Sequence, residues 1–172
     1  ALSPDGKLLA FTYQSKIFLV ASAGGTATPI TNGNFYPHHL VWSSDNKTLA
    51  FAAQPYGHDD VFTLEIGSNQ ITRHTYGSGD DIPTSFTNNG QALLFNTARI
   101  TSDQQDFYNL SRLEFGQLYR IDLKTQKAAV TMTLPAKNAV WNQNKSQLLY
   151  NSPHKDQAYR KHQQSFAVPN VW

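Results

Sequence analysis

The stretch that decides the fold is Ser3-Pro4-Asp5-Gly6-Lys7-Leu8-Leu9-Ala10-Phe11, because its pattern recurs three more times along the chain. The second copy, Ser43-Ser44-Asp45-Asn46-Lys47-Thr48-Leu49-Ala50-Phe51, keeps the turn residues and the apolar run. Two weaker copies occupy residues 87–95 and 142–150. An aromatic residue stands immediately before each of the later three copies, and these residues are Trp42, Phe86 and Trp141.

Each copy has the properties of a β-hairpin. Its centre holds an Asp-Gly, Asp-Asn, Asn-Gly or Asn-Lys pair that tolerates positive φ, and an apolar run ending in an aromatic residue follows. Further strand signals follow every hairpin, separated by turn signals. Third strands are expected at residues 17–20, 61–64, 118–121 and 171–172, and fourth strands at residues 28–31, 70–73 and 129–132.

Four antiparallel strands in about 40–45 residues form the unit of a β-propeller blade. The sequence therefore predicts an all-β chain made of β-propeller blades of four antiparallel strands. A β-sandwich also has short strands at regular intervals, but it gives no reason for the same turn and aromatic residue to recur with this period. The repeated runs are too β-branched, and too often broken by Gly, Asn and Pro, to form helices.

The two ends of the chain bear on the number of blades. Only Ala1 and Leu2 precede the first turn, and the fourth copy stops in its third strand, so we expect a single partial propeller of about three and a half blades. Propeller rings usually hold about four to eight blades, which favours a segment of a longer protein over a closed four-bladed ring. Open blade edges would allow self-association. The expected blades are residues 1–38, 39–82, 83–137 and 138–172.

The composition excludes several classes of protein. A formal net charge of +2 offers no general attraction to nucleic acid or to an acidic membrane, and three adjacent cations at residues 160–162 are too few for a nucleic-acid surface. The absence of cysteine rules out a disulfide scaffold, a thiol nucleophile and a zinc ribbon. No stretch approaches the roughly 20 apolar residues of a membrane span.

The candidate binding residues are expected on one rim. Connections in a four-stranded meander alternate between the two rims, so the second loop of each blade shares a rim with the links between blades. Two of these loops, residues 98–116 and 152–170, are long, and long loops in a compact repeat often carry binding sites. Links on this rim reach the inner strands near the central channel. The candidate contacts are His38, His39, His58, Asp80, Asp81, Arg160, Lys161 and His162.

No catalytic, metal or cofactor site is predicted. The histidines and aspartates of the rim fit no metal-ligand spacing, and adjacent residues of a strand are expected to point to opposite faces. The chain has no Gly-x-Ser-x-Gly elbow, no Ser-x-x-Lys motif and no Gly-rich phosphate loop. Asp103-Gln104-Gln105-Asp106 lacks the spacing of a calcium loop. Asp5 and Asp45 are expected to accept hydrogen bonds from amides of their own turns, which is a structural role.

Three segments carry a family resemblance. The first copy, with Ile17-Phe18-Leu19-Val20 and a Gly-Gly turn after it, resembles the repeat shared by TolB proteins and the amino-terminal propeller of tricorn-type proteases. Residues 81–99 are similar to a tricorn-like blade. Residues 160–172 resemble the Arg-Lys-His-His-x-Ser-x-x-x-Arg-Asp-Ile-Trp stretch of bacterial tricorn-like peptidases. Three positions depart from that stretch, namely Gln163, Pro169 and Asn170.

The resemblance implies a propeller segment of a secreted or periplasmic tricorn-like serine peptidase, which guides peptide substrates or mediates domain and subunit contacts. The catalytic residues would lie in a later domain, so the chain alone is expected to be no enzyme and to need no cofactor. The implied partners are peptide or protein substrates and C-terminal PDZ and protease domains. Two alternatives remain, a TolB-like periplasmic scaffold that binds other proteins and the propeller of a prolyl-oligopeptidase-type enzyme.

Overall fold

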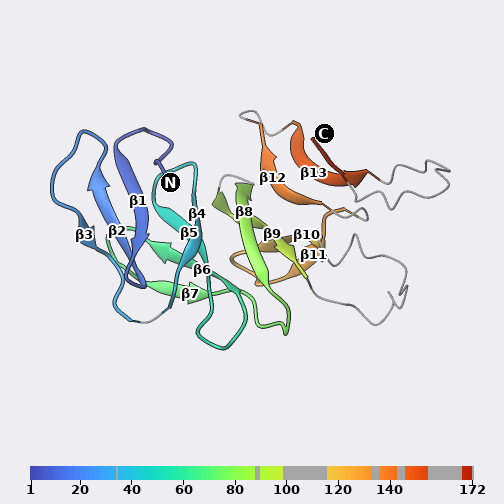
Figure 1. Ribbon diagram of the computed structural model, residues 1–172, viewed down its shortest axis with the longest axis horizontal. Coiled ribbons are helices and arrows are strands. Elements are labelled where there is room, and N and C mark those ends of the chain that lie inside the picture. The colour runs from blue at the N-terminus through green and yellow to red at the C-terminus, as the bar shows by residue number, and fades with distance from the viewer. Residues whose placement is uncertain are drawn as a thin grey trace.

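Four antiparallel sheets follow one another along the chain (Figure 1). The computed structural model describes residues 1–33, 35–87, 90–98, 116–132, 136–142, 146–154 and 168–171. The first sheet contains β1 (Leu8–Tyr13), β2 (Lys16–Ala21) and β3 (Thr28–Pro29), and the second contains β4 (His38–Trp42), β5 (Thr48–Ala53), β6 (Asp60–Glu65) and β7 (Ile71–Arg73). The third contains β8 (Asp81–Thr87), β9 (Ala92–Thr97), β10 (Gln117–Asp122) and β11 (Ala128–Val130), and the fourth contains β12 (Lys137–Trp141), β13 (Leu148–His154) and β14 (Val168–Val171).

The predicted fold of antiparallel propeller blades is confirmed. Strands that are consecutive in the sequence pair within each sheet, as a meander requires. Leu2 forms an isolated bridge with Leu9, at the place where the inner strand of the first blade would lie. One detail differs, because β14 begins at Val168 rather than at residue 171. Val168 pairs with His154 at the end of the long β13.

The first and fourth sheets lie at opposite ends of the molecule (Figure 1). The described strands therefore do not close on themselves, and the alternative of a closed four-bladed ring is wrong. Nor is there, in the part of the chain that the structure describes, a helix with the length and apolar character that crossing a membrane requires.

The repeated phrase forms the turn that its residue types predict. The Ser43 hydroxyl donates to the Asp45 carboxylate at 2.6 Å, and the same carboxylate oxygen accepts from the Lys47 amide at 3.1 Å. Asn46 has a φ of 61°, in the left-handed region that the Asp-Asn pair was expected to reach. Asp5 makes the equivalent hydrogen bonds in the first turn. The predicted structural role of both aspartates is confirmed.

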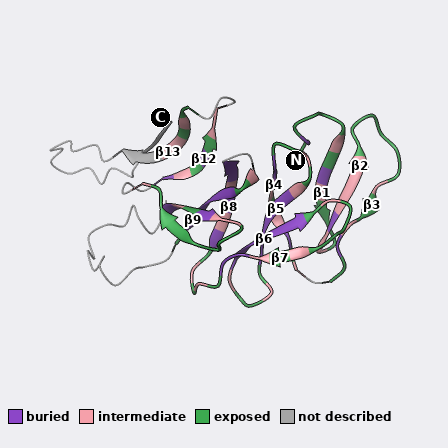
Figure 2. Cartoon of the chain, turned by 180° about the vertical axis from the view of Figure 1, so that it is seen from behind, coloured by how far each residue is buried: buried purple, intermediate pink, exposed green. Residues whose placement is uncertain are grey.

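Every contact between neighbouring sheets buries apolar side chains from both. Buried residues are concentrated in the central sheets (Figure 2), where most positions of β5 and β6 are inaccessible to water. At the first two contacts, small or branched residues of one sheet pack against larger residues of the next. Ala10 and Ile17 pack with Leu49, Phe51, Phe62 and Leu64, while Ala50 and Val61 pack with Phe86, Leu93, Phe95 and Ile121.

Candidate functional site

A pocket of about 530 Å³ opens between the inner strands of the second, third and fourth sheets. Its walls come from β4, β8 and β12, from the end of β9, and from Ala98 and Gly116, which follow β9 and precede β10. Apolar groups, including Leu40, Ile82 and Val140, form part of the wall. The polar residues that line it include His39, Asp80, Thr84, Asn96, Lys137 and Asn138.

A β-bulge recurs in the inner strands around this pocket. The pairing of β4 with β5 and that of β12 with β13 both shift register near the start of the inner strand. One pocket residue in each bulge has a left-handed backbone, His39 at φ 51° and Asn138 at φ 55°. In β8 the shift falls between Pro83 and Ser85. A proline ring holds φ near about −65°, so Pro83 does not adopt the left-handed backbone of His39 and Asn138. Bulges bend a strand and redirect its side chains.

The bulge overturns one expectation about the adjacent histidines. Alternation along a regular strand would place His38 and His39 on opposite faces, but their ring centroids are 5.0 Å apart. The left-handed backbone at His39 breaks the alternation. Burial lowers the pKa of the His39 ring below its ordinary value of 6.5, and the neighbouring His38 lowers it further. The neutral ring is therefore favoured, and it can donate or accept a hydrogen bond.

Hydrogen bonds tie the link before β8 to the loop before β6, beside the pocket. His38 Nε2 lies 3.2 Å from Asp59 Oδ2. The Asp59 amide donates to Asp80 Oδ1 at 3.0 Å, and the Asp81 amide donates to the Asp59 carbonyl at 2.8 Å. These contacts hold the start of the three strands β4, β6 and β8 together on one rim.

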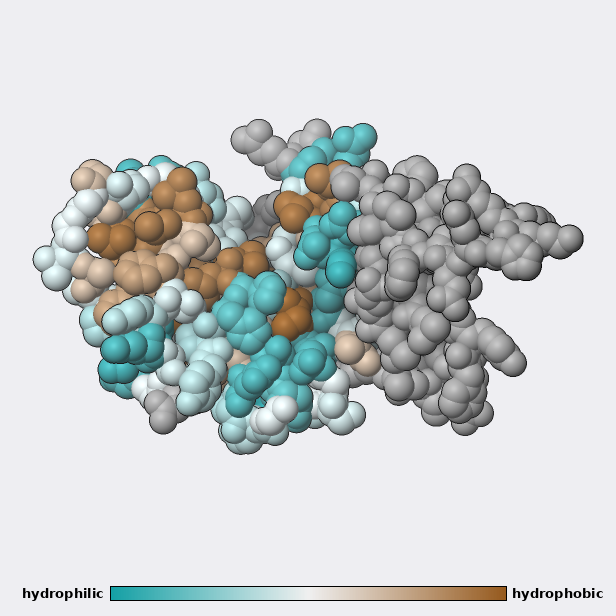
Figure 3. Space-filling view, in the orientation of Figure 1, coloured by the Kyte–Doolittle hydropathy of each residue, from teal (hydrophilic) through white to brown (hydrophobic). Residues whose placement is uncertain are grey.

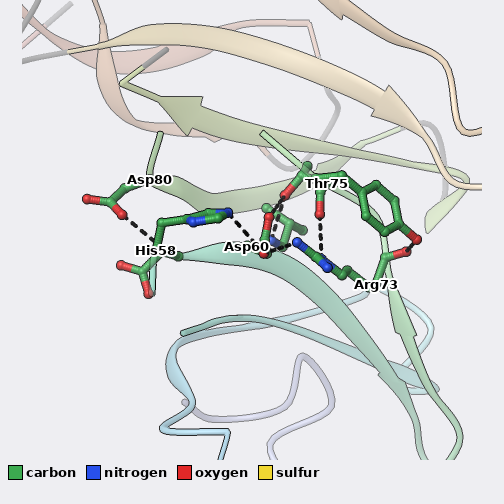
Figure 4. Close-up of polar contacts among 8 residues, drawn as sticks. His58, Asp60, Arg73, Thr75 and Asp80 are labelled. Atoms are coloured by element: carbon green, nitrogen blue, oxygen red, sulfur yellow. Dashed lines mark hydrogen bonds and ion pairs between the residues drawn. The ribbon is translucent and has the colours of Figure 1, made fainter. Parts of the chain in front are cut away.

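A buried ion pair lies on the same rim (Figure 4). Asp60, the first residue of β6, is fully buried, and its Oδ2 lies 2.6 Å from Nη2 of Arg73 at the end of β7. Thr75 donates to Asp60 Oδ1 at 3.3 Å, and His58 Nε2 lies 3.6 Å from Oδ2. A buried carboxylate requires a paired cation, so this cluster fixes the loop before β6 against the end of β7.

The predicted contacts are distributed over these features. His39 and Asp80 line the pocket, and His38 and Asp81 belong to the hydrogen-bonded links beside it. His58 contacts the buried Asp60 instead. Arg160, Lys161, His162 and Asp103–Asp106 lie outside the described residues, as does most of both long loops. No three His, Asp or Glu side chains in the described ranges are grouped so that they could hold a metal ion.

Sequence reasoning did not single out Thr84 and Asn96, although both line the pocket. Their positions depend on how β8 and β9 meet the neighbouring sheets, which no local pattern reports. A signal did exist for the bulges. The aromatic residues before the later three turns are Trp42, Phe86 and Trp141. The residues three positions before them are His39, Pro83 and Asn138, and all three line the pocket.

Comparisons with known sequences reach part of the chain. No protein-family model matches it. An uncharacterised protein of Agrobacterium fabrum is 30% identical over 103 residues, which are 57% of this chain and 35% of that protein. The Tol-Pal system protein TolB of Francisella tularensis is 32% identical over 72 residues, 41% of this chain and 17% of TolB. The chain thus spans about a third or less of these relatives.

Comparisons with solved structures cover nearly the whole chain. TolB from Acinetobacter baumannii matches 99% of this chain with 39% of its own, at a TM-score of 0.71 and 19% identity. A TolB-type protein from Agrobacterium tumefaciens matches 90% with 53% of its own, at a TM-score of 0.68 and 23% identity. The propeller of the Pyrococcus furiosus trilobed protease matches 95% of this chain with 48% of its own, at a TM-score of 0.55 and 11% identity. The chain therefore has a TolB-like β-propeller fold that peptidase propellers share.

Proposed function

We propose that this chain is a non-catalytic propeller scaffold of TolB type, which binds a segment of another protein in the pocket between β4, β8 and β12. One observation carries the proposal, namely that His39 and Asn138 hold left-handed backbones at equivalent bulges and both line the pocket. Non-glycine residues in this conformation are uncommon and cluster at ligand sites. The similarity to a Tol-Pal system protein supports a role in protein association.

The chemistry of the pocket suits a peptide. Its apolar wall includes Leu40 and Ile82, and its polar groups include the imidazole of His39, the carboxylate of Asp80 and the amide of Asn138. A peptide brings apolar side chains together with amide donors and acceptors, and pockets that combine both kinds of group bind such ligands. The volume of about 530 Å³ is in the usual range of about 300–1,000 Å³ for binding pockets.

Exposed tyrosines on the same rim support a protein ligand. Tyr36 lies in the link before β4, Tyr56 in the loop before β6 and Tyr76 in the link before β8. Their exposed fractions are 62%, 63% and 70%. Tyrosine is enriched in the energetically important part of protein interfaces, because it offers a large apolar ring together with a hydroxyl. A bound protein could contact these rings while one of its segments enters the pocket.

The propeller of a tricorn-like peptidase is the second candidate. The fold shared with the trilobed protease propeller favours it, whereas the most specific sequence match, at residues 160–172, lies outside the described residues except for β14. In that case the pocket would receive peptides on their way to a protease domain. The parent gene distinguishes the two candidates, since PDZ and peptidase regions after Trp172 would support the peptidase and further blades alone would support the scaffold. Either candidate places the protein in the periplasm or outside the cell.

Peptide selection tests the pocket directly. Random linear peptides displayed on phage are selected against the immobilised chain, and the affinities of enriched peptides are measured by fluorescence polarisation. Thr84→Arg fills the pocket with a long side chain and should weaken binding by about tenfold or more, which corresponds to about 1.4 kcal/mol. The matched control Thr28→Arg, on the exposed strand β3, should bind as the wild type does. A folded Thr84→Arg variant with wild-type affinity would show that the peptides bind elsewhere.

A further inference from the structure

The pocket exposes the main chain of β4 as well as side chains. Three consecutive residues of this strand, His39, Leu40 and Val41, line it. Successive side chains of a strand point to opposite faces. Accordingly, Leu40 packs with the cluster between the first and second sheets, whereas Val41 packs with the cluster between the second and third. Because these two side chains leave in opposite directions, what the residues share at the pocket is the edge of the strand.

This edge of β4 carries no paired strand within the described residues. The second sheet has the order β4-β5-β6-β7, so β4 pairs with β5 on one side only. The sheets that pack against the two faces of the second sheet, the first and the third, both belong to this chain. A blade added at either end of the sequence would therefore not lie beside β4. An unpaired strand edge is a template for pairing with another polypeptide.

The bulge in β4 adds main-chain groups to this edge. The ladder with β5 pairs His38 and then Val41, and it passes over the two residues between them. His39 and Leu40 therefore have no partner on β5, and both line the pocket. Their amide and carbonyl groups are available to a ligand that approaches the edge of the strand.

The two strands that face β4 across the pocket offer fewer main-chain donors. In β8, Pro83 has no N–H, and the Asp81 amide already donates to the Asp59 carbonyl. In β12, the fully buried Ala139 interrupts the row of pocket-lining residues. The edge of β4 is therefore the part of the pocket with a continuous run of main-chain donors and acceptors.

We propose that the pocket binds an extended segment of another protein, which pairs as an added strand with the edge of β4 at His39 and Leu40. The added strand rests on the proposed function and specifies how the ligand is held, namely by its main chain rather than by a fixed set of side chains. In an antiparallel ladder, every second residue directs both its N–H and its C=O at the neighbouring strand. Strand addition derives affinity from these hydrogen bonds, while pockets for alternate side chains add specificity.

Backbone-modified peptides test the pairing. The tightest peptide from the phage selection is synthesised as a series with one N-methylated amide in each member, and affinities for the full chain are measured by fluorescence polarisation. Methylation removes a donor and separates paired strands, so affinity should fall about tenfold at every second position of the paired stretch and less than about threefold between them. A series without this alternation would overturn the proposal.

Hydrogen exchange locates the added strand on the protein. At least one of the His39 and Leu40 amides should exchange about tenfold more slowly when the peptide saturates the chain, as read for each amide by NMR. The amides of β11 are the control, because this strand lies at the opposite edge of the third sheet from β8 and should exchange equally with and without peptide. Protection at Thr84 with none in β4 would place the strand on β8 and overturn the assignment.

Two substitutions separate a failure of the pairing from a failure of the proposed function. If Thr84→Arg weakens the peptide but methylation shows no alternation, the pocket is the site and the added strand is wrong. If Thr84→Arg has no effect, or no peptide is enriched, both are wrong. A hydrophobic area also lies over the first sheet (Figure 3), where Leu9 and Tyr13 are 39% and 58% exposed. Leu9→Asp should bind as the wild type does, and weaker binding would assign the peptide to that surface and overturn the proposal.

Discussion

Replacing Arg73 with alanine should destabilise the chain by about 3–5 kcal/mol, because removing one partner of a buried ion pair leaves an uncompensated charge. Asp60 is fully buried and lies 2.6 Å from the Arg73 guanidinium. Thr75 is a neutral donor at 3.3 Å, and His58 Nε2 lies 3.6 Å away, beyond hydrogen-bonding distance. Neither contact replaces a permanently charged guanidinium, so the full cost of the buried carboxylate should be observed.

The magnitude converts to a measurable change in melting temperature. One kcal/mol shifts the melting temperature of a chain of about 150–250 residues by about 2–4 °C, so the expected decrease is about 6–20 °C. The guanidinium also lies 4.2 Å and 4.5 Å from the ring centroids of Tyr56 and Tyr76, and these cation–π contacts are lost with it. Differential scanning calorimetry measures the melting temperature, and urea unfolding measures the free energy of unfolding. The urea midpoint should fall, while the slope of the unfolding free energy against urea concentration should stay constant.

A control and a rescue separate the buried charge from other effects. Arg120→Ala removes an arginine from an exposed position of β10 and should change stability by no more than about 0.5 kcal/mol. Asp60→Asn in the Arg73→Ala background removes the unpaired charge and should recover part of the loss. A loss below about 1 kcal/mol in Arg73→Ala, or a double variant that is no more stable than Arg73→Ala, would refute the reasoning.

Two further predictions concern a glycine and a histidine. Gly116→Ala should cost more than about 1 kcal/mol, because Gly116 has a φ of +66° and a Cβ would lie 2.5 Å from the Thr97 carbonyl oxygen; an unchanged melting temperature would contradict this. Burial lowers the pKa of His74 below its ordinary 6.5, against an opposing contact with Gln126, so its contribution to stability is present above pH 6.5 and lost as the pH falls through the lowered pKa. Urea midpoints at about pH 8 and about pH 5 should therefore differ less in His74→Gln than in the wild type, and an equal difference would assign the loss to other groups.

The turns and strands could be predicted because their causes are local. A serine, an aspartate and a residue tolerant of positive φ close the second turn through hydrogen bonds within a few residues, as Ser43, Asp45 and Asn46 do. The apolar runs that follow then pair in sequence order, since each strand meets its neighbour after a short connection. The end of β13 was less predictable, because its length depends on pairing with β14.

The pocket and the ion pair depend on register, which the sequence does not report. Asp60 and Arg73 meet because Phe62 pairs with Arg73, so Asp60 lies two positions along the neighbouring strand, on the same face. The two histidines at the start of β4 show the same limit. Regular alternation would separate their rings, and only the bulge, visible in the pairing of β4 with β5, brings them together.

The repeat also separates structural positions from candidate binding positions within one chain. Where copies agree, packing or turn chemistry explains the agreement, as with the stacked pair Phe11 and Phe18 and its counterpart in the second sheet. Where copies differ at one place in the blade, the fold does not require a particular side chain. His39, Pro83 and Asn138 stand at such a place, each three residues before an aromatic, and all three line the pocket. Because the scaffold supplies the same location with three different side chains, their chemistry is free to serve recognition.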